Sequence, residues 1–142
     1  MKKLMKKLMK AAAIAAIGLA IPLLAASEER PQPNGNSIWV ARDTVTSEIV
    51  DREPLNDGAA FSPAMGPVYY FTEVQGDGTP THITHIWYYE GQQMAQIPLS
   101  VEGPRWRTWS SKQILQDWTG SWRVEAVDAD GHVLSSQTFE IH

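Results

Sequence analysis

Hydrophobic and polar residues alternate in short stretches along most of the chain, and turn residues interrupt them every eight to twelve positions. Such alternation, in segments rich in β-branched and aromatic residues, predicts β-strands. The expected strands span residues 37–50 (as one strand or two), 68–74, 81–89, 92–101, 105–111, 121–128 and 132–141. Beyond the first 26 residues, no segment holds a helical period for three turns. About seven short strands predict an all-β fold, an antiparallel β-sandwich that is immunoglobulin-like. A small open barrel is the alternative architecture.

Turn residues and strand parity predict how these strands connect and which residues they bury. Glu90 with Gly91 and Asp130 with Gly131 are expected to form hairpin turns. Residues 55–67 are expected to be a connector, and residues 112–119 a helical turn or a loop. Residues two apart on a strand share a face. The residues expected on the buried faces are Trp87, Trp122, Val124, Ala126, Val133, Phe139 and Ile141.

The first 26 residues have the three parts of a secretory signal peptide. Five lysines precede an uncharged, mostly apolar run over residues 11–26, which ends at the small residues Ala25, Ala26 and Ser27. The alternative is a membrane anchor, but about 20 apolar residues are needed to cross a bilayer, and Gly18 and Pro22 interrupt this shorter run. We therefore expect cleavage after Ala26, a flexible tether over residues 27–37, a single domain over residues 38–142, and a periplasmic or secreted location.

Charge and cysteine content exclude several classes of function. The leader holds five of the 12 Lys and Arg residues, so seven remain against 16 acidic residues, a net charge of −9. Such an acidic chain is a poor match for nucleic acids or anionic membranes, which require a basic surface. The chain contains no cysteine, which removes disulfides and thiolate metal sites. We expect no nucleic-acid partner, no stable membrane insertion after cleavage, and no cofactor.

A basic, tryptophan-containing strip is the best candidate for a binding surface. Trp106 and Trp109 are three residues apart, which places them on opposite faces of a strand. Arg105 and Arg107 share the parity of Trp109, and Lys112 follows. Guanidinium groups bind carboxylates or phosphates at two points, and an aromatic face binds a sugar ring. The candidate residues are Arg105, Arg107, Trp109 and Lys112, with Arg52. In the alternative interpretation, the arginines cover tryptophan rings and pair with nearby carboxylates.

Metal binding and catalysis have weaker support. His82 and His85 are three apart on a predicted strand and therefore point to opposite faces. The segment from Asp128 to Gly131 resembles part of a calcium loop but lacks the downstream glutamate, so a hairpin turn explains it better. We predict no metal site and no catalytic residue. The rival hypothesis is a hydrolase or transferase that uses His85 with a nearby acid or with Ser110 or Ser111.

Several stretches together resemble a known family. They are Arg52-Glu53-Pro54, Tyr70-Phe71-Thr72-Glu73, His85-x-Trp87, the run RWRTWSSK at residues 105–112, Gly120-x-Trp122-x-Val124, and Asp130-Gly131-x-Val133-Leu134. This pattern resembles an uncharacterised bacterial domain family, and the similarity covers about residues 40–142. The resemblance implies an extracytoplasmic, β-rich domain and supplies no catalytic residues.

These observations favour a noncatalytic binding or interaction module of the cell envelope, with an anionic or sugar-like ligand or an envelope protein as its partner. Besides the hydrolase or transferase, a structural subunit that associates with copies of itself by strand edges is an alternative.

Export generates the first testable prediction. The protein purified from the periplasm should begin between Ser27 and Glu29, because signal peptidase cuts after small residues. Intact-mass spectrometry measures this directly. An unprocessed Met1 in the membrane fraction would contradict it.

Overall fold

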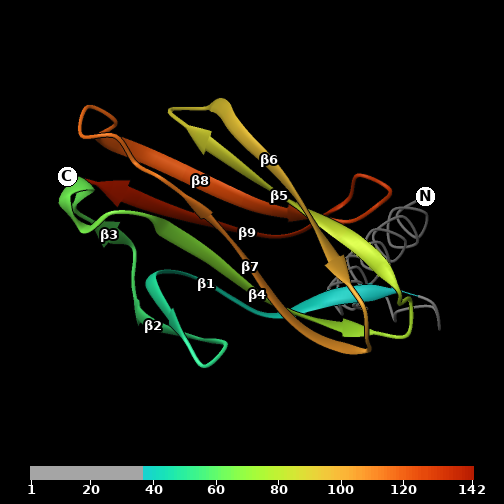
Figure 1. The fold of residues 1–142 in the computed structure, drawn as a ribbon. Helices are drawn as coiled ribbons and strands as arrows, with labels where there is room; N and C mark the ends of the chain where they lie inside the picture. The colour runs from blue at the N-terminus through green and yellow to red at the C-terminus, as the bar shows by residue number, and fades with distance from the viewer. Residues whose placement is uncertain (1–36) are drawn as a thin grey trace, which may run out of the picture. The chain divides into compact units, whose positions relative to one another are not determined.

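The computed structural model describes residues 37–142, and within them the chain forms nine β-strands (Figure 1). The strands are β1 (Ile38–Val50), β2 (Glu53–Asp57), β3 (Ala60–Phe61), β4 (Val68–Gly76), β5 (Thr81–Tyr89), β6 (Gln92–Val101), β7 (Arg105–Lys112), β8 (Gly120–Val127) and β9 (Val133–Ile141). A short 3-10 helix, η2 (Pro63–Met65), precedes β4. The predicted signal peptide and all but the last residue of the predicted tether lie outside the described residues.

The strands form two sheets that pack face to face. One sheet has the order β2-β1-β4-β7 and the other β3-β9-β8-β5-β6. All neighbouring strands are antiparallel except β3 and β9, which are parallel. The predicted all-β sandwich is therefore confirmed, and the separate sheets exclude the open barrel for this part of the chain. The finer, immunoglobulin-like assignment stays a prediction.

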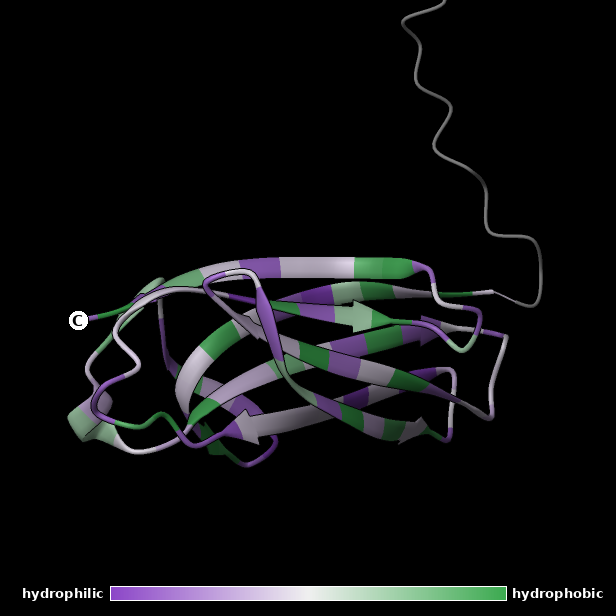
Figure 2. Cartoon of the chain, turned by 90° about the horizontal axis from the view of Figure 1, so that it is seen from above, coloured by the Kyte–Doolittle hydropathy of each residue, from purple (hydrophilic) through white to green (hydrophobic). Residues whose placement is uncertain are grey.

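Alternating burial along the strands builds the core between the sheets. Figure 2 shows hydrophobic and hydrophilic residues alternating along the strands. On β8, Trp122, Val124 and Ala126 are buried while Arg123 between them is exposed, as predicted. Trp87 is also buried, and the Phe139 ring packs between the two indoles. Its centroid lies 6.1 Å from Trp87 in an edge-on contact and 5.9 Å from Trp122 in a stacked one.

The ladders contain three register shifts, and those on β1 and β9 change faces that simple parity predicts. On β9, the pairing with β8 shifts at Leu134, so Val133 turns outward and is 55% exposed. The prediction that Val133 shares the buried face of Phe139 and Ile141 is therefore wrong. On β1, the pairing with β4 shifts at Ala41. This second bulge turns Arg42 to the outer face of its sheet, opposite Glu73.

The expected connector over residues 55–67 contains more structure than predicted. Its first residues belong to β2, which forms a hairpin with β1, and Phe61 in β3 is buried beside β9. The turn of this hairpin lacks the glycine that usually marks one, so its residues did not indicate a hairpin. Residues 112–119 were expected to form a helical turn or a loop. Beyond the end of β7 they form a loop without a helix, and Ile114 anchors this loop in the core. Among residues 37–142, no helix has the length and hydrophobicity of a membrane span.

Burial of Trp122 generates the second prediction. Trp122→Ala should lower the free energy of unfolding by about 3–5 kcal/mol, because it removes a buried indole and leaves a cavity. The matched control Val133→Ala, at an exposed site, should change it by less than about 0.5 kcal/mol. Urea denaturation measures both, and equal effects would contradict the assigned packing.

Candidate ligand-binding groove

Strand β7 presents different residues on its two sides. Trp106 packs against the core, whereas Trp109 lies on the outer face of the β2-β1-β4-β7 sheet, opposite Phe71. Arg105 and Arg107 share that outer face with Trp109. The odd spacing of the two tryptophans thus separates them as the sequence predicted.

A chain of ion pairs crosses the outer face of β4. Glu53, the first residue of β2, accepts hydrogen bonds from Arg42 at 2.8 and 3.0 Å and from Arg107 at 2.6 Å. Hydrogen bonds from Arg42, and next from Arg107, lower the pKa of Glu53 to about 2. Because β4 lies between β1 and β7, a carboxylate that reaches both arginines spans β4. The β1–β2 hairpin therefore folds over the outer face of its own sheet.

Glu73 on β4 extends this chain. Its side chain is 7% exposed, and it lies 3.0 Å from Arg105 Nε and 3.7 Å from Arg42 Nε. Beside it, Phe71 is fully buried although it lies outside the main core, with the Arg42 guanidinium 4.9 Å from its ring centre. Arg105 and Arg107 are therefore paired with carboxylates, as the alternative interpretation of the strip expected. Arg42, Glu53 and Glu73 were not among the predicted site residues.

Arg52 is held in a different way. Asp51 and Arg52 form the turn between β1 and β2, with left-handed φ angles of 50° and 64°. Arg52 Nη2 donates to the Arg107 carbonyl oxygen at 2.9 Å, and the guanidinium lies 5.6 Å from the Trp109 ring centre. Within residues 37–142, Arg52 forms no ion pair. A backbone carbonyl and an aromatic ring thus position its charge without neutralising it.

Arg52, Arg107 and Trp109 line a groove of about 350 Å³ between β6 and β7. Residues 98–100 of β6 form one wall, residues 106–109 of β7 form the other, and Arg52 lies beside them. Trp106, Trp109, Pro98 and Leu99 supply apolar surface. Ser100, Thr108 and the two arginines supply polar groups.

The groove gathers part of the predicted strip. Arg52, Arg107 and Trp109 line it together. Arg105 does not line the groove and is paired with Glu73. Lys112 lies further along β7, where its ammonium is 4.9 Å from the Trp118 ring centre. No sequence pattern indicated that Pro98, Leu99 and Ser100 would face Trp109, because β6 and β7 belong to different sheets.

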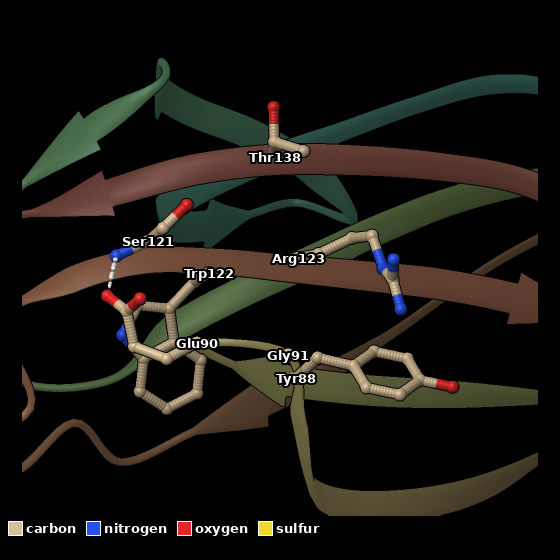
Figure 3. Close-up of a pocket in the computed structure, with 7 residues that line it drawn as sticks. All are labelled: Tyr88, Glu90, Gly91, Ser121, Trp122, Arg123 and Thr138. Atoms are coloured by element: carbon tan, nitrogen blue, oxygen red, sulfur yellow. Dashed lines mark hydrogen bonds between the residues drawn. The ribbon is translucent and has the colours of Figure 1, made fainter.

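A second depression, of about 300 Å³, lies on the other sheet (Figure 3). Its charged side chains already have partners: Glu90 accepts a hydrogen bond from the Ser121 amide at 2.8 Å. The Arg123 guanidinium lies 4.2 Å from the Tyr88 ring centre and forms an ion pair with Glu125 at 3.6 Å. The depression therefore offers a ligand fewer free polar groups than the groove.

Three potential metal ligands converge in the β8–β9 turn. One ligand atom each from Asp128, Asp130 and His132 lie within 4.8 Å of one another. Asp128 Oδ1, however, accepts the backbone amides of Asp130 at 2.9 Å and His132 at 2.8 Å. These bonds are those of a side chain that closes a turn, which agrees with the interpretation of this segment as a hairpin.

His85 and Ser110 form a hydrogen-bonded pair inside the sandwich. Ser110 Oγ lies 2.7 Å from His85 Nδ1, and His85 Nε2 lies 3.2 Å from Thr72 Oγ1. The single hydroxyl proton of Thr72 goes to the Thr108 carbonyl, so His85 Nε2 carries a proton and donates it to Thr72. His85 Nδ1 then accepts from the Ser110 hydroxyl, which itself accepts from Trp87 Nε1 at 3.1 Å. Every side-chain donor in this hydrogen-bond network has an acceptor.

This hydrogen-bond network joins the two sheets and does not form a catalytic triad. Thr72 and Ser110 belong to the β2-β1-β4-β7 sheet, whereas His85 and Trp87 belong to the other sheet. His85 is fully buried and Ser110 is 5% exposed, so no substrate reaches them in this conformation. The position that an aspartate occupies in a triad is taken by the hydroxyl of Thr72.

The fold and the groove define a β-sandwich domain with a candidate binding site between β6 and β7, the edge strands of the two sheets. Residues 80–141 match the model of a family described as "Protein of unknown function (DUF2914)". This match confirms the predicted resemblance to an uncharacterised domain family over that range. It includes both strand walls of the groove and the RWRTWSSK run, whereas Arg52 and Glu53 lie outside it. A comparison with curated proteins finds no match.

Burial of His85 generates the third prediction. Burial lowers the pKa of His85 from 6.5 to about 3. As the pH falls, the His85 ring therefore binds a proton in the unfolded chain at a higher pH than in the folded one. The stabilisation present above pH 6.5 is lost as the pH falls toward 3. The free energy of unfolding should decrease by up to about 1.4 kcal/mol per pH unit in this window.

Denaturation between about pH 6.5 and 5 isolates this effect, because the lowered pKa of Glu53 places its titration below 4.5. His85→Gln should remove the slope, and His82→Gln, at an exposed site on the same strand, should keep it. An NMR titration in which the His85 ring of the wild type protonates near pH 6.5 would contradict the prediction.

Proposed function

We propose that this protein is a noncatalytic binding or interaction module of the cell envelope, located in the periplasm or secreted. Its proposed site is the groove that contains Arg52, Arg107 and Trp109. The observation that carries the proposal is the state of Arg52, whose charge is positioned beside Trp109 with no ion pair among residues 37–142.

The chemistry of the groove favours an anionic or sugar-like ligand. A guanidinium binds carboxylates and phosphates through two parallel hydrogen bonds, and an indole face gives a ring or an apolar group a flat contact surface. Arg107 lies next to Arg52 but shares its charge with Glu53, so we assign the main anion contact to Arg52. Arg105 and Lys112 supply only longer-range positive potential in this proposal.

A binding role fits the groove better than catalysis fits His85. The Ser110–His85 distance of 2.7 Å is the one feature that favours a hydrolase. Both groups, however, lie in the core and are used in contacts between the sheets. The groove, in contrast, combines exposed Arg52 with partly exposed Trp109.

The fourth prediction tests this binding role. An array of cell-wall fragments, acidic glycans and small organic acids should contain a ligand that quenches tryptophan fluorescence. Added salt should weaken its binding, because exposed charges are screened over about 8 Å at physiological ionic strength. Arg52→Ala and Trp109→Ala should each reduce affinity by about tenfold or more, because they remove a charged or an aromatic contact, with little change in melting temperature.

The matched control is Arg123→Ala, which removes another guanidinium that lies over an aromatic ring but belongs to the opposite sheet. The affinity of the Arg123→Ala variant for the ligand should equal that of the wild type. Equal losses in Arg52→Ala and Arg123→Ala would show that binding follows overall charge, and an array without any binder would reject the proposed site.

A further inference from the structure

In the described part of the chain, the backbone of β7 has one side without a strand partner. The Gly76 amide donates to the Pro104 carbonyl at 3.0 Å, which fixes the phase of the ladder between β4 and β7. Ladder bonds alternate from residue to residue along an antiparallel strand. The even-numbered residues of β7 therefore pair with β4, and the odd-numbered residues direct their N–H and C=O groups away from it. The bond from Arg52 to the Arg107 carbonyl agrees with this assignment.

These odd-numbered groups lie along the groove. Within residues 37–142, β7 is the last strand of its sheet, and β6 on the other side of the groove forms ladder bonds only with β5. A space of about 350 Å³ thus borders the N–H and C=O groups of Trp109 and the N–H of Arg107, which bond to none of the nine described strands there. An edge strand in this state is a template for another extended chain.

The charges on β7 indicate what kind of strand fits. The sequence RWRTWSSK carries three basic residues and no acidic residue. A second copy of β7 paired with this edge would offer Arg52 no carboxylate, because this run contains none. An acidic strand would instead place a carboxylate beside Arg52, whose charge is not neutralised by any residue in the described domain.

From this arrangement we infer that the groove binds an extended acidic peptide segment of a partner protein, which adds to the open edge of β7 as a further strand. The backbone of the peptide bonds to Arg107 and Trp109, and one of its carboxylates binds Arg52. An apolar side chain next to that carboxylate contacts Pro98, Leu99 or Trp106 across the groove. This inference rests on the proposed binding function and names its ligand and its geometry.

Amide hydrogen exchange tests the geometry directly. In the free protein, the amides of Arg107 and Trp109 should exchange much faster than those of Trp106 and Thr108, because only the even-numbered amides lie in a ladder. The probe is a capped peptide in which valine residues alternate with threonine or glutamate residues. At saturation it should slow exchange at Arg107 and Trp109 by about tenfold or more. Binding without this protection would overturn strand addition.

Variants of the peptide and the protein separate backbone from side-chain contacts. Replacing the glutamates of the peptide by glutamine should weaken binding by about tenfold, as should N-methylation of its alternate amides. Trp109→Pro should bind more weakly than Trp109→Ala, since both lose the indole but only proline also removes the outward amide. Equal affinities for these two variants would count against the edge contact.

The outcomes distinguish this inference from the proposed function. If acidic glycans bind and the peptide does not, the groove is a binding site but the inferred strand addition is wrong. If neither binds, the proposed function fails as well. If Arg107 and Trp109 are already protected in the free protein, and protection rises together with dimer on gel filtration, a second copy occupies the edge and the inference is overturned.

Discussion

The position of Arg52 at the groove depends on one carboxylate, that of Glu53. It bridges Arg42 on β1 and Arg107 on β7, and so holds the β1–β2 hairpin across the outer face of the sheet. The Arg52 turn precedes it directly in the chain, so the same bridge places Arg52 over Trp109. Because two arginines lower the pKa of Glu53 to about 2, the bridge stays ionised at any moderately acidic pH. An ion pair that is partly exposed adds little stability by itself, and here its main effect is to fix geometry.

The two polar networks of the domain have separate tasks. The chain through His85 lies between the sheets, is buried, and satisfies each donor with an acceptor. Such a fully satisfied network favours one relative arrangement of the sheets, because any shift would leave buried polar groups without partners. The arginine and glutamate chain lies on the outside and fixes the hairpin. Sheet packing and the placement of Arg52 at the groove therefore depend on different residues, and a substitution in one network leaves the other network's contacts in place.

Strand parity predicted much of the fold and only part of the site. The β5–β6 hairpin, the buried face of β8 and the opposite orientations of Trp106 and Trp109 follow from the period of two and from glycine-containing turns. The bulges on β1 and β9 do not follow from it, because a single unpaired residue leaves no mark in composition. Without the bulge at Ala41, Arg42 would face the core and could not bind Glu53. The turn at Asp51 and Arg52 contains no glycine, so the hairpin that brings Arg52 to β7 was not predicted.

Strand β7 also constrains how this domain can evolve. Its even-numbered backbone groups bond to β4, Trp106 and Ser110 face the core, and Arg105, Arg107 and Trp109 cover the outer face. An insertion or deletion of one residue within this strand would exchange the two faces. It would place arginines in the core and a core tryptophan among the arginines. We therefore expect variation among relatives to change the groove through substitutions and through the length of the loops around β7, while the length of the strand itself stays constant.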